Sequence, residues 1–357
     1  MKRYLGFCPL LLGLAFAPVS HAADSSALEK EIDVLKENTT ELSTRLDDAM
    51  SVSGYTDAEY TSDSKKGGNA DGFRIHHLSL FFEKRISDQW RFFSEIEYAD
   101  GPKFEGKTAE GKIFAEAANL SYAWRPDLSF RLGRFFTPAG IWNVDHYPPF
   151  VPTQERPLHI RDIFPQIFDG AMVYGTRPIG GSFLKYDLCW GNGEGNAGRK
   201  DGNSEKATGL NVGLLLPFLK HTEIGLTYYG DTDNSRTEKL AGGAHAKIKA
   251  GGFALQSEYA RGDYKPTSGS DYTNTGYYGQ FMYNFRDWTI GMRHSVYDKN
   301  TATDAIDNKQ VANGAFVNYH ISHALVVKLE HHLFSYNNDT KDEYESTIFS
   351  VVAYLGN

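Results

Sequence analysis

The feature that most constrains this chain is a two-residue hydrophobic alternation that recurs along most of its length. Between residues 210 and 216, Leu210, Val212 and Leu214 share one face, whereas Asn211 and Gly213 share the other. The same alternation returns in 223–228, 253–259, 277–284 and 325–333. Each lies in a segment of about ten residues between turn-rich stretches, which is the length that a tilted strand needs to cross a bilayer. The pattern therefore predicts membrane-crossing strands.

We expect sixteen such strands, because sixteen segments carry the alternation between turn-rich stretches. They are 52–61, 73–84, 90–99, 112–124, 128–135, 170–177, 181–190, 207–217, 221–230, 242–250, 252–262, 274–285, 288–297, 308–320, 323–335 and 346–356. Every second connection is tight, as at Arg125-Pro126-Asp127, and the others are long and polar, as in 62–72 and 191–206. Short turns at one end and long loops at the other are typical of an outer-membrane barrel.

Such strands must close on themselves, because lipid cannot satisfy the backbone N–H and C=O groups of an open edge. Aromatic side chains near the strand ends fit the two membrane interfaces. They include Trp90, Tyr98, Trp124, Tyr186, Trp190, Tyr228, Tyr259 and Trp288. The alternative is a soluble all-β chain, either tandem sandwiches or a propeller, but no blade repeat is visible. We therefore predict an all-β fold, a 16-stranded antiparallel transmembrane β-barrel over residues 51–357.

Composition excludes several other classes. The formal net charge is −8, whereas a nucleic-acid-binding protein needs a basic face. After the N-terminal region no run of about 18 to 20 apolar residues occurs, which excludes a bundle of transmembrane helices. Two cysteines exclude a disulfide framework.

Residues 1–22 have the pattern of a secretory signal peptide. Lys2 and Arg3 precede an apolar run over 4–19, and small residues at Ser20 and Ala22 suit a cleavage site. The alternative is an N-terminal membrane anchor, but the run is short. We expect an exported protein in the outer membrane of a Gram-negative bacterium.

Residues 23–50 predict a short coiled-coil helix in the periplasm. Apolar residues recur there at alternating spacings of four and three, with Thr39 as the one polar residue of the seam. A helix this short is marginal alone, which favours an oligomer. The alternative is a single amphipathic helix packed on the main body. The expected trimerisation residues are Leu28, Ile32, Leu35, Leu42 and Leu46.

The third long connection, residues 134–169, differs from the others in being rich in proline and aromatic residues. It is too apolar for a solvated or disordered loop. We expect it to fold inward against the barrel wall and narrow the pore. The alternative is an external lid or a contact with a neighbouring barrel.

Several short motifs carry a resemblance to a known family. They are Leu132-Gly133-Arg134-Phe135-Phe136-Thr137-Pro138-Ala139-Gly140, Glu155-Arg156-Pro157, Ile163-Phe164-Pro165 before Asp169-Gly170, and Glu95-Ile96-Glu97-Tyr98-Ala99. The chain resembles the phosphate-selective porin O and P family, and its N-terminal coiled coil is similar to the dicarboxylate-channel branch of such porins. The resemblance implies a homotrimer that takes up small anions through an arginine-lined inner loop, with Arg134, Arg156 and Arg161 at the constriction.

The charges predicted to face the pore do not by themselves indicate selectivity. Alternation gives eight inward bases and eight inward acids, so anion preference rests on the resemblance. To the constriction set we add Arg131, and the expected basic residues of the wall are Lys185, Lys247, Lys249, Arg293 and Lys328. The alternative for each charge is a solvated wall residue or a cross-strand ion pair. A general or sugar-permeable porin without anion selectivity stays open as a second function.

We expect neither enzymatic activity nor a cofactor. No G-x-S-x-G motif is present, although a barrel enzyme or a purely structural barrel stays an alternative. His76-His77 and His331-His332 are adjacent pairs, and neighbours on a strand point to opposite faces, so we expect no metal site. The expected partners are outer-membrane lipid and small hydrophilic solutes that diffuse passively.

Overall fold

The computed structural model describes residues 33, 34, 36, 49–65, 71–105, 108–160, 162–194, 200–217, 222–301, 309–337 and 343–356, and of residues 100–112 only the backbone. The chain divides into Met1–Ala49 and Met50–Asn357. The expected signal peptide and the seam residues Leu28, Ile32, Leu35, Leu42 and Leu46 lie outside the described residues. Among those that are described, no helix is long and apolar enough to span a membrane.

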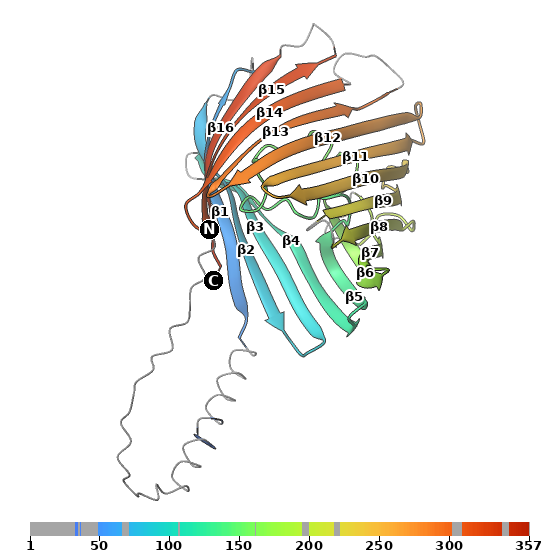
Figure 1. Ribbon diagram of the computed structural model, residues 1–357. Coiled ribbons are helices and arrows are strands. Elements are labelled where there is room, and N and C mark those ends of the chain that lie inside the picture. Colours follow the sequence, from blue (N-terminus) through green and yellow to red (C-terminus); the bar gives the residue numbers. More distant parts are fainter. Residues whose placement is uncertain are drawn as a thin grey trace, which may run out of the picture. The chain divides into compact units, whose positions relative to one another are not determined.

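The second unit is a closed barrel of sixteen antiparallel strands in sequential order, which confirms the predicted fold class (Figure 1). The strands are β1 (Ser51–Asp63), β2 (Gly72–Arg85), β3 (Trp90–Glu105), β4 (Thr108–Arg125), β5 (Leu128–Phe136), β6 (Ile167–Ile179), β7 (Ser182–Gly191), β8 (Ala207–Leu216), β9 (Thr222–Thr232), β10 (Glu238–Ala250), β11 (Phe253–Lys265), β12 (Tyr272–Phe285), β13 (Trp288–Asp298), β14 (Lys309–His320), β15 (Leu325–Tyr336) and β16 (Tyr344–Tyr354).

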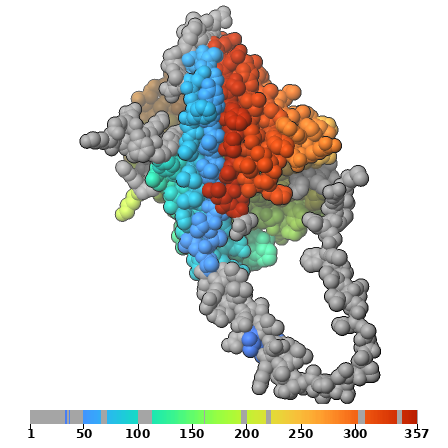
Figure 2. Space-filling model, turned by 90° about the vertical axis from the view of Figure 1, so that its left-hand side faces the viewer, coloured from blue at the N-terminus to red at the C-terminus, as the bar shows by residue number. Residues whose placement is uncertain are grey.

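The barrel closes where its first and last strands pair. The register runs without a break from Tyr55 opposite Tyr354 to Asp63 opposite Ser346. Figure 2 shows this seam, with the blue N-terminal strand directly against the red C-terminal strand. Closure gives every strand two partners, so no strand edge is left exposed.

Burial in the barrel wall is inverted relative to a soluble protein. Along β11 the apolar Phe253, Leu255 and Tyr259 are 43–52% exposed, whereas the polar Gln256 and Glu258 are 5–8% exposed. A sheet with an apolar outer face and a polar inner face is the pattern of a barrel that lipid surrounds and water or protein fills.

Tight turns connect the strands at one end, and aromatic pairs cluster beside them. Gly180 and Gly181 both adopt positive φ (52° and 84°), as the two-residue turn between β6 and β7 requires. Close to the other turns, Trp90 packs on Tyr122 with ring centroids 4.9 Å apart, and Trp288 packs on Tyr319 at 4.6 Å. At the loop end several strands extend beyond their predicted bounds.

An arginine on the outer face should destabilise the barrel in lipid. Leu226 is 67% exposed near the middle of β9. Burying a guanidinium in hydrocarbon costs about 2–4 kcal/mol at the bilayer midplane. We therefore expect Leu226→Arg to lower the free energy of unfolding from lipid vesicles by about that amount. The control is Glu205→Arg in an exposed loop, and equal stability of the two variants would contradict a lipid-facing wall.

Candidate functional site

The segment between β5 and β6, residues 137–166, is called the inner loop here. Its prolines, at 138, 148, 149, 152, 157 and 165, prevent it from forming a regular strand or helix. Its backbone forms short turns, for example where the N–H of Asp145 donates to the carbonyl of Ile141 (2.9 Å), and the polar groups that these turns leave unpaired need partners outside the segment. Inward side chains of strands all around the barrel provide these partners, and the loop runs across the interior (Figure 1).

Strand β15 supplies the strongest contacts to the inner loop. The ammonium group of Lys328, which is 1% exposed, donates to the carbonyl oxygens of Pro148 (2.6 Å) and Val151 (2.7 Å). Two residues further, the Glu330 carboxylate accepts from the backbone N–H of Gln154 (2.7 Å) and Glu155 (3.2 Å). The two charged side chains thus fix one turn of the loop through both its donors and its acceptors.

A second basic residue acts in the same way on β13. Arg293, 4% exposed, donates to the Thr153 hydroxyl and to the carbonyl of Glu155, both at 2.7 Å. Its guanidinium also lies 5.6 Å from the ring centre of Trp142, a cation–π distance. Lys328 and Arg293, predicted as basic residues of the pore wall, are therefore enclosed by the inner loop.

Across the closure seam, the neighbouring strands β1 and β3 hold the loop through acidic residues. Gln154 donates to Asp57 on β1 (2.8 Å), and the Tyr147 hydroxyl donates to Glu95 on β3 (3.2 Å). These acids are fully buried (both 0% exposed). Carboxylates of β1 to β4 are thus covered by the loop.

Strands β9 and β11 complete the set of contacts. The backbone N–H of Trp142 donates to Glu258 (2.9 Å), and that of Gly140 donates to Thr227 (3.2 Å). Trp142 is 1% exposed and packs on Tyr278. The inner loop is therefore held by strands on both sides of the barrel. It occupies part of the lumen and narrows the space that stays open.

One charged cavity of about 100 Å³ lies between the first part of the inner loop and the wall of β5 to β10. Its charged lining residues are the bases Arg131, Lys185 and Lys247 and the acids Asp145, Asp187 and Glu223. Lys247 approaches Asp145 of the loop at 3.6 Å. Arg131 donates to Ser121 (3.1 Å) and lies over the ring of Tyr174. These bases keep part of their surface open to solvent.

The remaining predicted basic residues are placed differently. Lys249 follows Lys247 on the same inward face of β10 and is exposed. Arg156 lies on the inner loop and is partly buried, and Arg161 lies outside the described residues. The cavity thus brings together Arg131, Lys185 and Lys247 from the predicted set.

Arg134 faces away from the pore. It forms a bidentate ion pair with Asp169 across β5 and β6 (2.7 and 2.8 Å). The next residue, Phe135, is 1% exposed in an interior cluster with Ile163 and Phe168. Because neighbouring residues on a strand alternate, Arg134 lies on the opposite, outward face. Its assignment as a constriction residue has no support in this placement.

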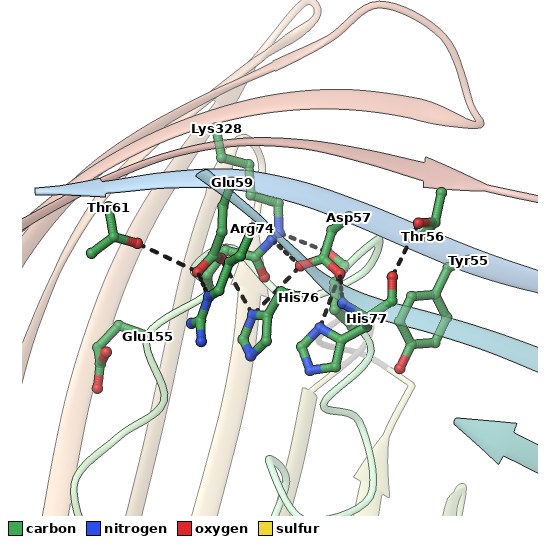
Figure 3. Close-up of polar contacts among 12 residues, drawn as sticks. Tyr55, Thr56, Asp57, Glu59, Thr61, Arg74, His76, His77, Glu155 and Lys328 are labelled. Carbon is green, nitrogen blue, oxygen red and sulfur yellow. Dashed lines mark hydrogen bonds and ion pairs between the residues drawn. The ribbon is translucent and has the colours of Figure 1, made fainter. Parts of the chain in front are cut away.

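A β-bulge changes the expected geometry of the histidine pair on β2. Asp57 pairs with His77 and Ala58 pairs with Ile75, so His76 is an extra residue in β2. The rings of His76 and His77 therefore lie on the same, inner side, with centroids 3.7 Å apart (Figure 3). The expectation that these neighbours point to opposite faces was wrong.

Burial affects the protonation of one residue on the inner loop. His159 is 2% exposed, and its Nδ1 has no hydrogen-bond partner among the described residues. Burial lowers the pKa of this imidazole from 6.5 to about 4, because the charged form is not solvated. His159 is thus neutral in the folded protein at neutral pH.

The comparisons with known proteins support the fold. No protein-family model matches the chain. One curated relative, an uncharacterized protein of Aquifex aeolicus, is 30% identical over 132 residues, which cover 36% of this chain and only 30% of the relative. The assignment to the phosphate-selective family therefore stays a prediction.

Solved structures of outer-membrane proteins share the architecture. An anion-selective porin from Comamonas acidovorans has a TM-score of 0.65 at 11% identity, with 86% of this chain and 99% of that chain covered. OmpT of Vibrio cholerae gives 0.61 at 10% identity, covering 85% and 97%. The outer-membrane channel DcaP of Acinetobacter baumannii gives 0.56 at 10%, covering 86% and 96%. The chain thus has the fold of the outer-membrane porins.

Removing the Lys328 ammonium group should loosen the inner loop. Lys328→Met keeps the length of the side chain but leaves the carbonyls of Pro148 and Val151 without this donor. Each unsatisfied buried group costs about 1–3 kcal/mol. We expect faster chymotryptic cleavage after Phe150, which lies between these two carbonyls and is 68% exposed, while the barrel stays folded. Lys200→Met in an exposed loop is the control, and an unchanged cleavage rate would contradict the role of Lys328.

The lowered pKa of His159 predicts an acid-sensitive contribution to stability. The unfolded chain binds a proton near pH 6.5, whereas the folded protein binds it only near pH 4. The contribution of His159 to the free energy of unfolding is fully present above pH 6.5. It falls as the pH drops toward 4, by about 3 kcal/mol in total. Urea unfolding in detergent should show a smaller loss between these pH values for His159→Gln than for the wild type. Parallel pH profiles of the two proteins would refute this.

Proposed function

We propose that the protein is an outer-membrane porin through which small hydrophilic solutes diffuse passively. A closed barrel with an apolar outer face and an inner loop that restricts the lumen supports this proposal. The structural neighbours, which include an anion-selective porin and an outer-membrane channel, agree with it. In such a pore the solute moves down its gradient, and the constriction selects by width and electric field.

We further infer a preference for small anions, such as phosphate or dicarboxylates. The single observation that supports this is that Arg131, Lys185 and Lys247 gather, partly exposed, at the cavity beside the inner loop. Acids on the β1 to β4 side are buried beneath the inner loop, for example Glu95 and Glu116 (0% and 1% exposed). The bases of β5 to β10 keep exposed surface at the cavity. An anion there would exchange part of its hydration shell for charge-assisted hydrogen bonds.

A general or sugar-permeable porin is the second candidate. Asp187 and Glu223 share the cavity with the bases, and Lys247 is close to Asp145. These acids oppose the field of the bases, so the net charge at the cavity is small. If they cancel it, the pore would select by width alone.

We also propose a homotrimer in the outer membrane of a Gram-negative bacterium, with residues 23–50 as a periplasmic coiled coil. The heptad spacing of that segment supports an oligomer. One structural neighbour, in-vitro folded OmpT of Vibrio cholerae, was solved in a trimer form. Open steps in groups of three in planar bilayers would agree with three pores per particle.

Anion selectivity should depend on the bases of the cavity. Lys185→Gln combined with Lys247→Gln removes two charges, and each close charge contributes about 1 kcal/mol in water. We expect the anion-to-cation permeability ratio, measured as the reversal potential in asymmetric KCl, to fall by up to roughly thirtyfold. Lys200→Gln is the control outside the cavity. Cation preference of the wild type, or equal ratios for all three proteins, would contradict the anion assignment.

A further inference from the structure

We propose that Asp57, His76 and His77, with Glu59 beside them, form a binding site for a divalent transition-metal ion of the zinc type. The site lies on the inner wall where β1 pairs with β2. This proposal is independent of which solutes the pore passes.

The donor atoms already lie at the spacing that a metal ion needs. The Nδ1 atom of His77 is 2.9 Å from Asp57 Oδ1, and the Nδ1 atom of His76 is 3.7 Å from Asp57 Oδ2. One ligand atom from each of the three residues lies within 4.8 Å of the other two. Ligands about 2.0–2.2 Å from a tetrahedral zinc ion are separated by about 3.3 Å, so the cluster needs little rearrangement.

Two buried atoms in this cluster have only ion-pair contacts. The Oε2 atom of Glu59 contacts the Nδ1 atom of His76, and this nitrogen also approaches Asp57, but neither atom makes a well-oriented hydrogen bond within the part of the chain that the structure describes. They lie 3.3 Å apart and face each other (Figure 3). Glu59 is only 2% exposed. A cation shared between these two atoms would give each a stronger partner than their ion pair does.

The charges around the cluster are compatible with a divalent cation. Asp57 and Glu59 contribute two carboxylates, and neutral imidazoles contribute nitrogen ligands, the donor set that suits zinc. Arg74 donates to Oε1 of Glu59 (2.6 Å) and leaves Oε2 directed at His76. Gln154 of the inner loop binds Oδ2 of Asp57 (2.8 Å), so the site is joined to the constriction.

The second adjacent pair provides an internal comparison. The register of β15 with β16 is unbroken at His331 and His332, which pair with Thr347 and Ser346. His332 is buried against Glu330, whereas the side chain of His331 is 46% exposed. Without a bulge, the two rings cannot bind one ion. The bulge at His76 is therefore the specific feature that creates the proposed site.

Zinc titration of the detergent-folded full-length protein tests this proposal. After treatment with a chelator, isothermal titration calorimetry with ZnCl₂ should show one ion per chain. His76→Gln and His77→Ala should each weaken binding at least about tenfold, because even the loss of an outer-shell partner costs about 10–100-fold. His331→Ala should bind as the wild type does, and Mg²⁺ should not compete.

A second measurement separates metal ligation from a structural role. Co²⁺ in place of Zn²⁺ should give the visible absorption bands of a tetrahedral site in the wild type and in His331→Ala, and these bands should be lost in His76→Gln. Bilayer conductance of His76→Gln should stay as in the wild type, which shows that the barrel is folded. No zinc binding by the wild type, or equal binding by His76→Gln and His331→Ala, would overturn the proposal.

Discussion

The structure depends on one constraint, which is that every backbone N–H and C=O group in a hydrocarbon environment needs a partner inside the protein. The pairing of β1 with β16 satisfies this for the wall, because it removes the last two free edges of the sheet. Once the wall is closed, outward side chains need only be apolar, and inward side chains are free to be charged. The inverted burial along β11 follows directly from this separation.

The inner loop meets the same constraint in another way. It has no regular hydrogen-bond ladder, so Lys328, Glu330, Glu258 and Arg293 supply partners to its backbone. Charges that would otherwise act on a permeating solute are used to hold the loop. Of the bases predicted from the sequence, Arg131, Lys185 and Lys247 stay at the cavity, together with Asp145, Asp187 and Glu223. Architecture and selectivity thus draw on the same inward-facing residues.

The sequence predicted the fold well, because a strand has a fixed period and lipid makes that period visible in every strand. It also identified residues 134–169 as distinctive from proline and aromatic content alone. The contacts of Lys328 with Val151 could not be predicted, because they join positions 177 residues apart and no local signal marks them. Arg134 and His76 show a second limit. Where a single residue points depends on strand register and on bulges, and one extra residue in β2 changes the side on which His76 lies.

The contacts of the inner loop also depend on closure of the barrel. Its partners include Asp57 on the first strand and Glu330 on the penultimate strand. The side chain of Gln154 donates to Asp57, and its backbone N–H donates to Glu330. These two residues come close together only when the N-terminal and C-terminal strands have joined. The complete set of loop contacts can therefore form only in the closed barrel, and a chain that stalls before its final strand would lack the bridge that Gln154 makes between Asp57 and Glu330.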